Sequence, residues 1–131
     1  MTKVFIDGSA GTTGLRIFER LSSRTDIQLM TLSGELRKDP EARREMLNKA
    51  DIAFLCLPDK AAVEAVSLID NDHTAVIDTS TAHRVNDAWA YGFPELSGPH
   101  RRAIRESRRI ANPGCHASGF ISAVCPLVAT A

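Results

Sequence analysis

The segment Ala111–Gly119 holds the residue best suited to covalent chemistry, Cys115. It reads Ala-Asn-Pro-Gly-Cys-His-Ala-Ser-Gly and leads into an apolar, helix-like run. Proline and glycine at positions 113 and 114 impose a sharp bend that presents the next side chain, and amides at a helix start favour a thiolate over a thiol. A free cysteine is most often a buried packing residue, and no packing requirement asks for such a bend. The sequence therefore predicts Cys115 as a nucleophile.

A glycine-rich loop near the N-terminus is the candidate cofactor site. It follows a short apolar run at residues 3–7, which indicates a buried strand, and it precedes a helical pattern. Glycine allows the backbone to approach a pyrophosphate, and amides at the helix start bind its charge. The spacing is G-x-x-G-x-x-G, so the position between strand and helix carries the interpretation, and a flexible turn is the alternative. The residues predicted to bind the cofactor are Gly8, Ser9, Ala10, Gly11, Thr12, Thr13 and Gly14.

A strand is predicted at residues 27–32. The segment that follows it is expected to distinguish NADP from NAD. NAD sites usually place a carboxylate at the end of this strand to hold the ribose hydroxyls. Here Glu35 comes late, among Ser33, Arg37 and Lys38. These three side chains could hold a 2′-phosphate, so the sequence favours NADP, with a solvated basic loop as the alternative.

Two further loops supply candidate substrate residues. Thr79–Arg84 follows a predicted strand at residues 75–78, and ligands of an open parallel sheet bind at the edge where such loops emerge. We predict Ser80 and Arg84 as substrate or nicotinamide contacts, with ordinary loop capping as the alternative. Asn112, in the bend before Cys115, is the third predicted substrate residue.

The elements that must position these residues alternate between strand and helix. Further strands are expected at residues 51–57, with Cys56 in the middle as a packing residue, and at 109–111. Helices are expected after Gly14, from Asp39-Pro40, from a cap at Pro58-Asp59 through Ile69, and from Ser97; residues 89–96 are expected to form a packed loop. The apolar stripe expected on the helix that ends at Ile69 consists of Ala62, Val63, Val66 and Ile69. This alternation predicts an α/β fold with a doubly wound parallel sheet of the Rossmann type.

Composition limits the function classes. The 131 residues are 44% hydrophobic, enough for one domain with a core. Sixteen basic and sixteen acidic residues cancel, so no overall field favours nucleic acid or a membrane surface, and a small molecule is the expected partner. The three cysteines lack metal-ligand spacing, so we expect no metal site. Their odd number and the lack of an apolar leader indicate a cytoplasmic protein.

Five motifs, in this order, resemble the short-type N-acetyl-gamma-glutamyl-phosphate reductases of arginine biosynthesis, and the resemblance extends over the whole chain. They lie at residues 7–14, 53–59, 77–84, 91–96 and 112–115. The resemblance implies NADPH-dependent reduction of N-acetylglutamyl 5-phosphate, an acyl phosphate, to N-acetylglutamate 5-semialdehyde through a thioester on Cys115. The alternatives are an aspartate-semialdehyde dehydrogenase of the same superfamily, or a nucleotide-binding module or fragment without catalysis of its own.

The chain departs from this family after Cys115 and in length. The family usually has an aromatic residue and a threonine where His116 and Ser118 stand. Neighbouring helical side chains point about 100° apart, so we expect His116 to flank the pocket. The family has a second domain that supplies the catalytic histidine, a substrate-binding arginine and most of the subunit interface. We therefore expect an NADP-binding domain at 1–114, the start of a truncated catalytic domain at 115–131, poor activity of the isolated chain, and a homo-oligomer when the second domain is present.

Overall fold

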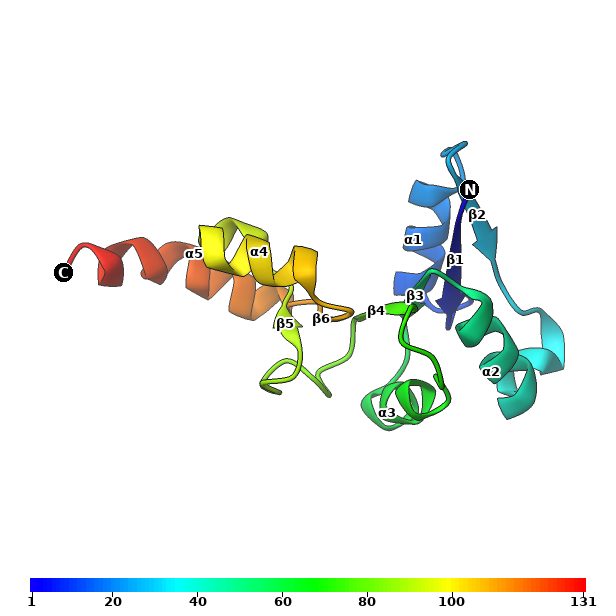
Figure 1. The fold of residues 1–131 in the computed structure, drawn as a ribbon. Helices are drawn as coiled ribbons and strands as arrows, with labels where there is room; N and C mark the ends of the chain where they lie inside the picture. Colours follow the sequence, from blue (N-terminus) through cyan, green and yellow to red (C-terminus); the bar gives the residue numbers. More distant parts are fainter.

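Six parallel strands form a single sheet in the order β2-β1-β3-β4-β6-β5 in the computed structural model, which describes all 131 residues. The strands are β1 (Thr2–Asp7), β2 (Ile27–Met30), β3 (Ile52–Leu55), β4 (Ala75–Asp78), β5 (Ala90–Tyr91) and β6 (Arg109–Ala111). The helices are α1 (Thr12–Leu21), α2 (Pro40–Lys49), α3 (Asp59–Ser67), α4 (Gly98–Glu106) and α5 (Cys115–Ala129), with 3₁₀ turns η1 (Gly34–Lys38) and η2 (Pro94–Leu96). Figure 1 shows α1 on one face of the sheet and α2 and α3 on the other. The predicted doubly wound parallel sheet is confirmed.

The core lies where α2 and α3 cover the central strands. Phe5, Leu55 and Val76 come from β1, β3 and β4, and Leu47 of α2 is fully buried with them. A strand that is covered on both faces needs a continuous apolar run, and β1 and β3 have one. The predicted start of α2 is confirmed, because Pro40 is its first residue and the Asp39 carboxylate accepts a hydrogen bond from the Glu41 amide.

Two predicted strands are longer than those observed. β2 ends at Met30, and β3 ends at Leu55, so Cys56 follows the strand and does not lie in its middle. The Cys56 amide still donates to the carbonyl of Asp7, and Pro58, which has no N–H, cannot continue the ladder beyond it.

The structure corrects the predicted end of α3, its cap, one residue of its apolar stripe and part of the loop predicted at 89–96, while Val66 and Ile69 of the stripe pack against the core as predicted. Helix α3 ends at Ser67 and buries Ala62 and Ala65, whereas Val63 is 53% exposed, because the helix turns its smallest residues toward the sheet. Asp59 does not cap the helix, since its carboxylate accepts hydrogen bonds from Thr81 instead. Ala90 and Tyr91 form a short strand at the sheet edge, beside β6.

Helix α5 begins at the predicted position and projects beyond the sheet (Figure 1). None of its residues is buried, and Phe120, Leu127 and Val128 are 68–70% exposed. Nowhere in the chain does a helix combine the length and apolar character needed to cross a bilayer.

Candidate cofactor and nucleophile site

At the carboxyl edge of the sheet, the first residue after β3, β4 and β6 is in each case hydrogen-bonded to the last residue of the neighbouring strand. The Cys56 amide donates to Asp7 at 2.9 Å, the Thr79 amide to Leu55 at 3.0 Å, and the Asn112 amide to Asp78 at 2.8 Å. Each loop is therefore fixed to the end of the strand before it in the sheet. This arrangement brings the glycine loop, Thr79–Arg84 and the Cys115 bend to one edge, which is where open parallel sheets bind ligands.

The glycine loop is a tight turn that only glycine permits at two positions. Gly8 has φ +85°, and a Cβ there would overlap the carbonyl oxygen of Cys56. A Cβ on the buried Gly14 would overlap the carbonyl oxygen of Gly8. Gly11 caps α1 without any side-chain hydrogen bond, and the first turn of α1 carries no acidic residue. The amides at this helix start are thus free to bind an anionic group.

A buried ion pair lies at the end of β1, directly before the glycine loop. The sequence analysis did not identify it. The carboxylate of Asp7, the last residue of β1, lies 3.0 Å from the guanidinium of Arg43 in α2, and both side chains are more than 90% buried. Burial raises the pKa of Asp7, and Arg43 opposes that rise. The sequence signal that could have revealed this ion pair is a carboxylate at the end of an apolar strand, because a buried charge requires a partner. The pair fixes β1 against α2 directly before the glycine loop.

The residues predicted to select NADP lie beyond the end of β2. Ser33 precedes η1, and Arg37 and Lys38 lie in its last turn. All three are exposed, and Arg37 donates from Nε to the Gly34 carbonyl at 3.3 Å. Because β2 neighbours β1 in the sheet, this segment emerges at the same edge as the glycine loop.

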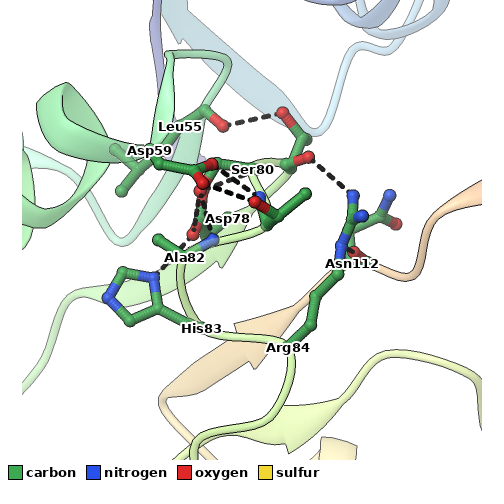
Figure 2. A network of polar contacts seen from close by, with 10 residues as sticks. Leu55, Asp59, Asp78, Ser80, Ala82, His83, Arg84 and Asn112 are labelled. Atoms are coloured by element: carbon green, nitrogen blue, oxygen red, sulfur yellow. Dashed lines mark hydrogen bonds and ion pairs between the residues drawn. The ribbon is translucent and has the colours of Figure 1, made fainter.

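The loop after β4 is built around the fully buried carboxylate of Asp78 (Figure 2). Its Oδ1 accepts from the Ser80 amide at 2.9 Å, and its Oδ2 accepts from the Ser80 hydroxyl at 2.7 Å and lies 2.6 Å from Nδ1 of His83. The His83 ring stacks on Trp89 with 3.9 Å between ring centroids. Ser80 and His83 are both buried, and the Ser80 hydroxyl already donates its proton to Asp78.

The same loop is fixed to α3 through Asp59. Its carboxylate accepts from the Thr81 amide at 2.9 Å and from the Thr81 hydroxyl. These hydrogen bonds hold the pKa of Asp59 below its usual range, because they stabilise the charged form. The role of Asp59 is therefore to hold the β4 loop.

Arg84 joins the β4 loop to the bend that carries Cys115 (Figure 2). Its guanidinium donates to the backbone carbonyls of Asn112 at 3.0 Å and Thr79 at 3.1 Å. It also covers Gly114, where an added Cβ would stand 2.8 Å from the Arg84 Nη1. Arg84 thus places a positive charge beside the first turn of α5, while the Asn112 side chain remains exposed.

Cys115 is the first residue of α5 and is exposed, with Gly114 as the N-cap. Its Sγ lies 3.7 Å from Nδ1 of His116, a hydrogen-bonding distance for sulfur. Helical geometry places neighbouring side chains about 100° apart, yet the imidazole of His116 lies within reach of the thiol. Of the other two cysteines, Cys125 is exposed and Cys56 is half-buried, and burial raises the pKa of the Cys56 thiol to about 11.

The family described as "Semialdehyde dehydrogenase, NAD binding domain" matches residues 35–106, more than half of the chain. The chain belongs to this family. The matched region runs from η1 to the end of α4, so it includes the Asp78 network. Family membership agrees with a Rossmann-type sheet and with binding of a nicotinamide dinucleotide.

The curated relatives carry the name that the five motifs indicated. N-acetyl-gamma-glutamyl-phosphate reductase from Chelativorans sp. (strain BNC1) is 59% identical over 96% of this chain, and the enzyme of the same name from Mesorhizobium japonicum is 55% identical over 96%. N-acetyl-gamma-glutamyl-phosphate reductase 2 from Nostoc sp. is 48% identical over 97%. The chain spans only 39–41% of the length of these relatives.

Solved structures agree on the fold. Aspartate semialdehyde dehydrogenase from Francisella tularensis superposes with a TM-score of 0.74 at 18% identity, covering 99% of this chain and 41% of its own. The enzyme from Candida albicans, solved with NADP, gives 0.71 at 15% identity over 99% of this chain and 47% of its own. At these identities the likeness concerns the fold alone.

Proposed function

We propose that this chain carries the cofactor site and the nucleophile of an NADP-dependent N-acetyl-gamma-glutamyl-phosphate reductase. The observation that carries the proposal is the position of Cys115, which starts a helix at the same sheet edge as a glycine loop with free amides. The identity of the substrate is inferred from relatives that are 48–59% identical over almost the whole chain and are all named as this reductase. The substrate is N-acetylglutamyl 5-phosphate and the product N-acetylglutamate 5-semialdehyde.

The residues proposed to bind the cofactor do so through backbone amides and through positively charged side chains. Amides of the loop Gly8–Gly14 bind the pyrophosphate, because the turn brings the backbone close and α1 presents unpaired N–H groups. Ser33, Arg37 and Lys38 hold the 2′-phosphate of NADP through charge-assisted hydrogen bonds. When bound, the cofactor supplies the hydride that reduces the acyl group.

The acyl group is carried by Cys115. Its sulfur attacks the acyl carbon of the substrate, a C–S bond forms, the C–O bond to phosphate breaks, and phosphate leaves. Arg84 holds the nucleophile loop through the Asn112 carbonyl and contributes a positive charge beside the site of attack. The exposed side-chain amide of Asn112 contacts the substrate. The buried Ser80 contributes indirectly, because its hydrogen bond to Asp78 fixes the conformation of the loop after β4.

A second candidate is a nucleotide-binding module without catalysis of its own. One observation favours it: His83, the histidine in the loop beside the nucleophile bend, is buried between Asp78 and Trp89 and cannot reach a substrate. A positioned acid-base group typically contributes about 10²–10⁴-fold in rate. Without such a group, thioester formation would proceed slowly and turnover would be low.

The phosphate-dependent reverse reaction separates the two candidates. The chain is mixed with N-acetylglutamate 5-semialdehyde, NADP and phosphate, and NADPH formation is followed in wild type, Cys115→Ser and Cys125→Ser. A reductase gives a signal, even a weak one, that requires phosphate, is lost in Cys115→Ser and remains in Cys125→Ser. NADPH binding with no such signal in any of the three proteins would favour the binding module.

A further inference from the structure

The buried ion pair between Asp7 and Arg43 is a charged cluster that the proposed chemistry does not use. Arg43 of α2 donates to Oδ2 of Asp7 from Nε at 3.1 Å and from Nη2 at 3.0 Å. Its Nη1 also lies 3.6 Å from Oε1 of Glu64 in α3. Asp7 and Arg43 are only 4% and 7% exposed, whereas the Glu64 side chain is 53% exposed and therefore screened by solvent. The charge of Arg43 is thus balanced mainly by Asp7.

The position of this pair in the chain connects it to the glycine loop. Asp7 is the last residue of β1, and Gly8, the first residue of the loop, follows it directly. Burial raises the pKa of Asp7, and the charge and hydrogen bonds of Arg43, together with the Gly8 amide, oppose that rise by stabilising the carboxylate. The Asp7 carboxylate therefore interacts both with a buried cation and with the first amide of the loop.

The other groups that face Asp7 do not neutralise it. Glu64 carries the same charge as Asp7. The thiol of Cys56, which follows β3, has its pKa raised to about 11, chiefly by burial, so it is neutral at pH 7. Strand β2 contains no charged residue, and α1 covers the opposite face of the sheet from α2 (Figure 1). Arg43 alone forms an ion pair with Asp7.

We propose that Arg43 is a positioning residue for the cofactor, because it cancels the charge of Asp7 and so allows the glycine loop to accept a pyrophosphate. The pyrophosphate of a dinucleotide is anionic, and an unpaired buried carboxylate one residue before the loop would repel it. The proposal rests on the proposed function for the location of the pyrophosphate at Gly8–Gly14. It adds that α2, which contributes no residue to that loop, controls the affinity through one charge.

Coulomb's law gives the size of the effect. Two unit charges about 10 Å apart, at an effective dielectric constant of about 20, change a binding constant by about 10- to 20-fold. We therefore expect Arg43→Met, which leaves Asp7 unpaired, to weaken NADPH binding at pH 8 by about 10- to 20-fold. The loss should shrink as the pH falls. Removal of Arg43 raises the pKa of Asp7 further, and a protonated carboxyl group no longer repels the pyrophosphate.

Three further variants separate the effect of charge from that of structural support. Asp7→Asn keeps the shape of the side chain and removes its charge, so it should bind NADPH at least as tightly as the wild type. The double variant, Asp7→Asn with Arg43→Met, removes both charges and should bind NADPH about as tightly as the wild type at pH 8. Arg44→Met is the matched control, because it removes a neighbouring arginine of α2 whose ion pair with Asp70 is exposed. It should not change the affinity.

NADPH binding is followed by a fluorescence titration between pH 6.5 and pH 8.5, and thermal unfolding of each protein without cofactor is recorded in the same buffers. Breaking a buried ion pair by removing one partner is strongly destabilising, whereas replacing both partners is often tolerated. If Arg43→Met does not fold, Asp7→Asn and the double variant still decide the question, because they differ only at position 43. Asp7→Asn, which keeps the Arg43 charge, should bind NADPH more tightly than the double variant.

Equal weakening of NADPH binding in Asp7→Asn, Arg43→Met and the double variant at every pH would overturn the proposal, because it would show that the pair only supports the fold. Undiminished binding by Arg43→Met at pH 8 would overturn it too. Failure of the proposed function gives a different result. If the wild type binds NADPH but N-acetylglutamyl 5-phosphate leaves no adduct on Cys115, the reductase assignment fails and the titrations still decide the role of Arg43. If the wild type binds no NADPH, both the cofactor site and this role of Arg43 are wrong.

Discussion

Gly14 is the position at which one methyl group should disrupt the cofactor loop. A Cβ at Gly14 would overlap the Gly8 carbonyl oxygen and stand 2.8 Å from the Ser9 Cα, so every atom in its way is backbone. Gly11 provides a matched control in the same loop, because the nearest atom to a Cβ there is the Gly8 carbonyl oxygen at 3.5 Å, an ordinary contact. The two alanine variants therefore add the same group with very different consequences.

The expected cost can be estimated for each variant. Overpacking against atoms that cannot rotate away costs about 1–3 kcal/mol, and the overlap at Gly14 belongs at the upper end. The gain in helix propensity from glycine to alanine offsets about 1 kcal/mol, which leaves a net loss of about 2 kcal/mol for Gly14→Ala. In a domain of this size that lowers Tm by about 5–10 °C. Gly11→Ala loses only the preference of an N-cap for glycine over alanine, about 0.5–1 kcal/mol.

Thermal unfolding followed by circular dichroism measures both variants, and a fluorescence titration with NADPH measures the site. Gly14→Ala should melt clearly below Gly11→Ala. Gly11→Ala should keep the fold yet bind NADPH more weakly, because it adds a methyl group at the N-cap of the helix whose amides are proposed to bind the pyrophosphate. Equal melting temperatures for the two variants would refute the described turn, and undiminished NADPH binding by Gly11→Ala would refute the placement of the cofactor.

Three further predictions concern the cofactor, the thiols and the response to acid. Arg37→Ala should weaken NADPH binding but not NADH binding, by about 1.5–3 kcal/mol for a lost charge-assisted hydrogen bond; parallel titrations check this, and an equal loss for both cofactors would contradict it. Limited alkylation at pH 8 should label Cys115 first and Cys56 last, because burial raises the pKa of Cys56 to about 11; early labelling of Cys56 would show that the β3 loop is open. The pKa of Asp59 is lowered by Thr81, so its stabilising effect is present above about pH 4, the ordinary value for aspartate, and is lost as the pH falls through the folded-state value. Thr81→Val should therefore lower Tm at pH 6, and the difference from wild type should shrink toward pH 3.5; a constant difference would exclude this linkage.

The parts of the site that sequence reasoning predicted are those fixed by local pattern. Gly8 follows an apolar run, whereas Gly14 lies in the first turn of α1, which begins at Thr12 and not after Gly14 as the sequence predicted. Proline and glycine before Cys115 likewise determine where α5 starts. In both places the local sequence predicts the turn, although Gly8 also packs against the Cys56 carbonyl and Gly114 against Arg84.

The parts that were missed depend on contacts between distant segments or on a rotamer. Arg43 is 36 residues from Asp7 and meets it only because α2 packs over β1. Ser80 and His83 turn inward because Asp78 is buried by the assembled sheet, which the polar sequence of that loop does not reveal. The contact between His116 and Cys115 follows from the torsion angles of two adjacent side chains, and helical periodicity alone places them apart.

Acylation of Cys115 tests the central claim most directly. The wild-type chain, Cys115→Ser and Cys125→Ser are incubated with N-acetylglutamyl 5-phosphate, quenched in acid and examined by intact mass and peptide mapping. We expect the wild type and Cys125→Ser to gain one N-acetylglutamyl group on the peptide that contains Cys115, released by hydroxylamine as a thioester should be, and Cys115→Ser to gain none. An adduct that persists in Cys115→Ser, or that maps to Cys125, would contradict the assignment of the nucleophile.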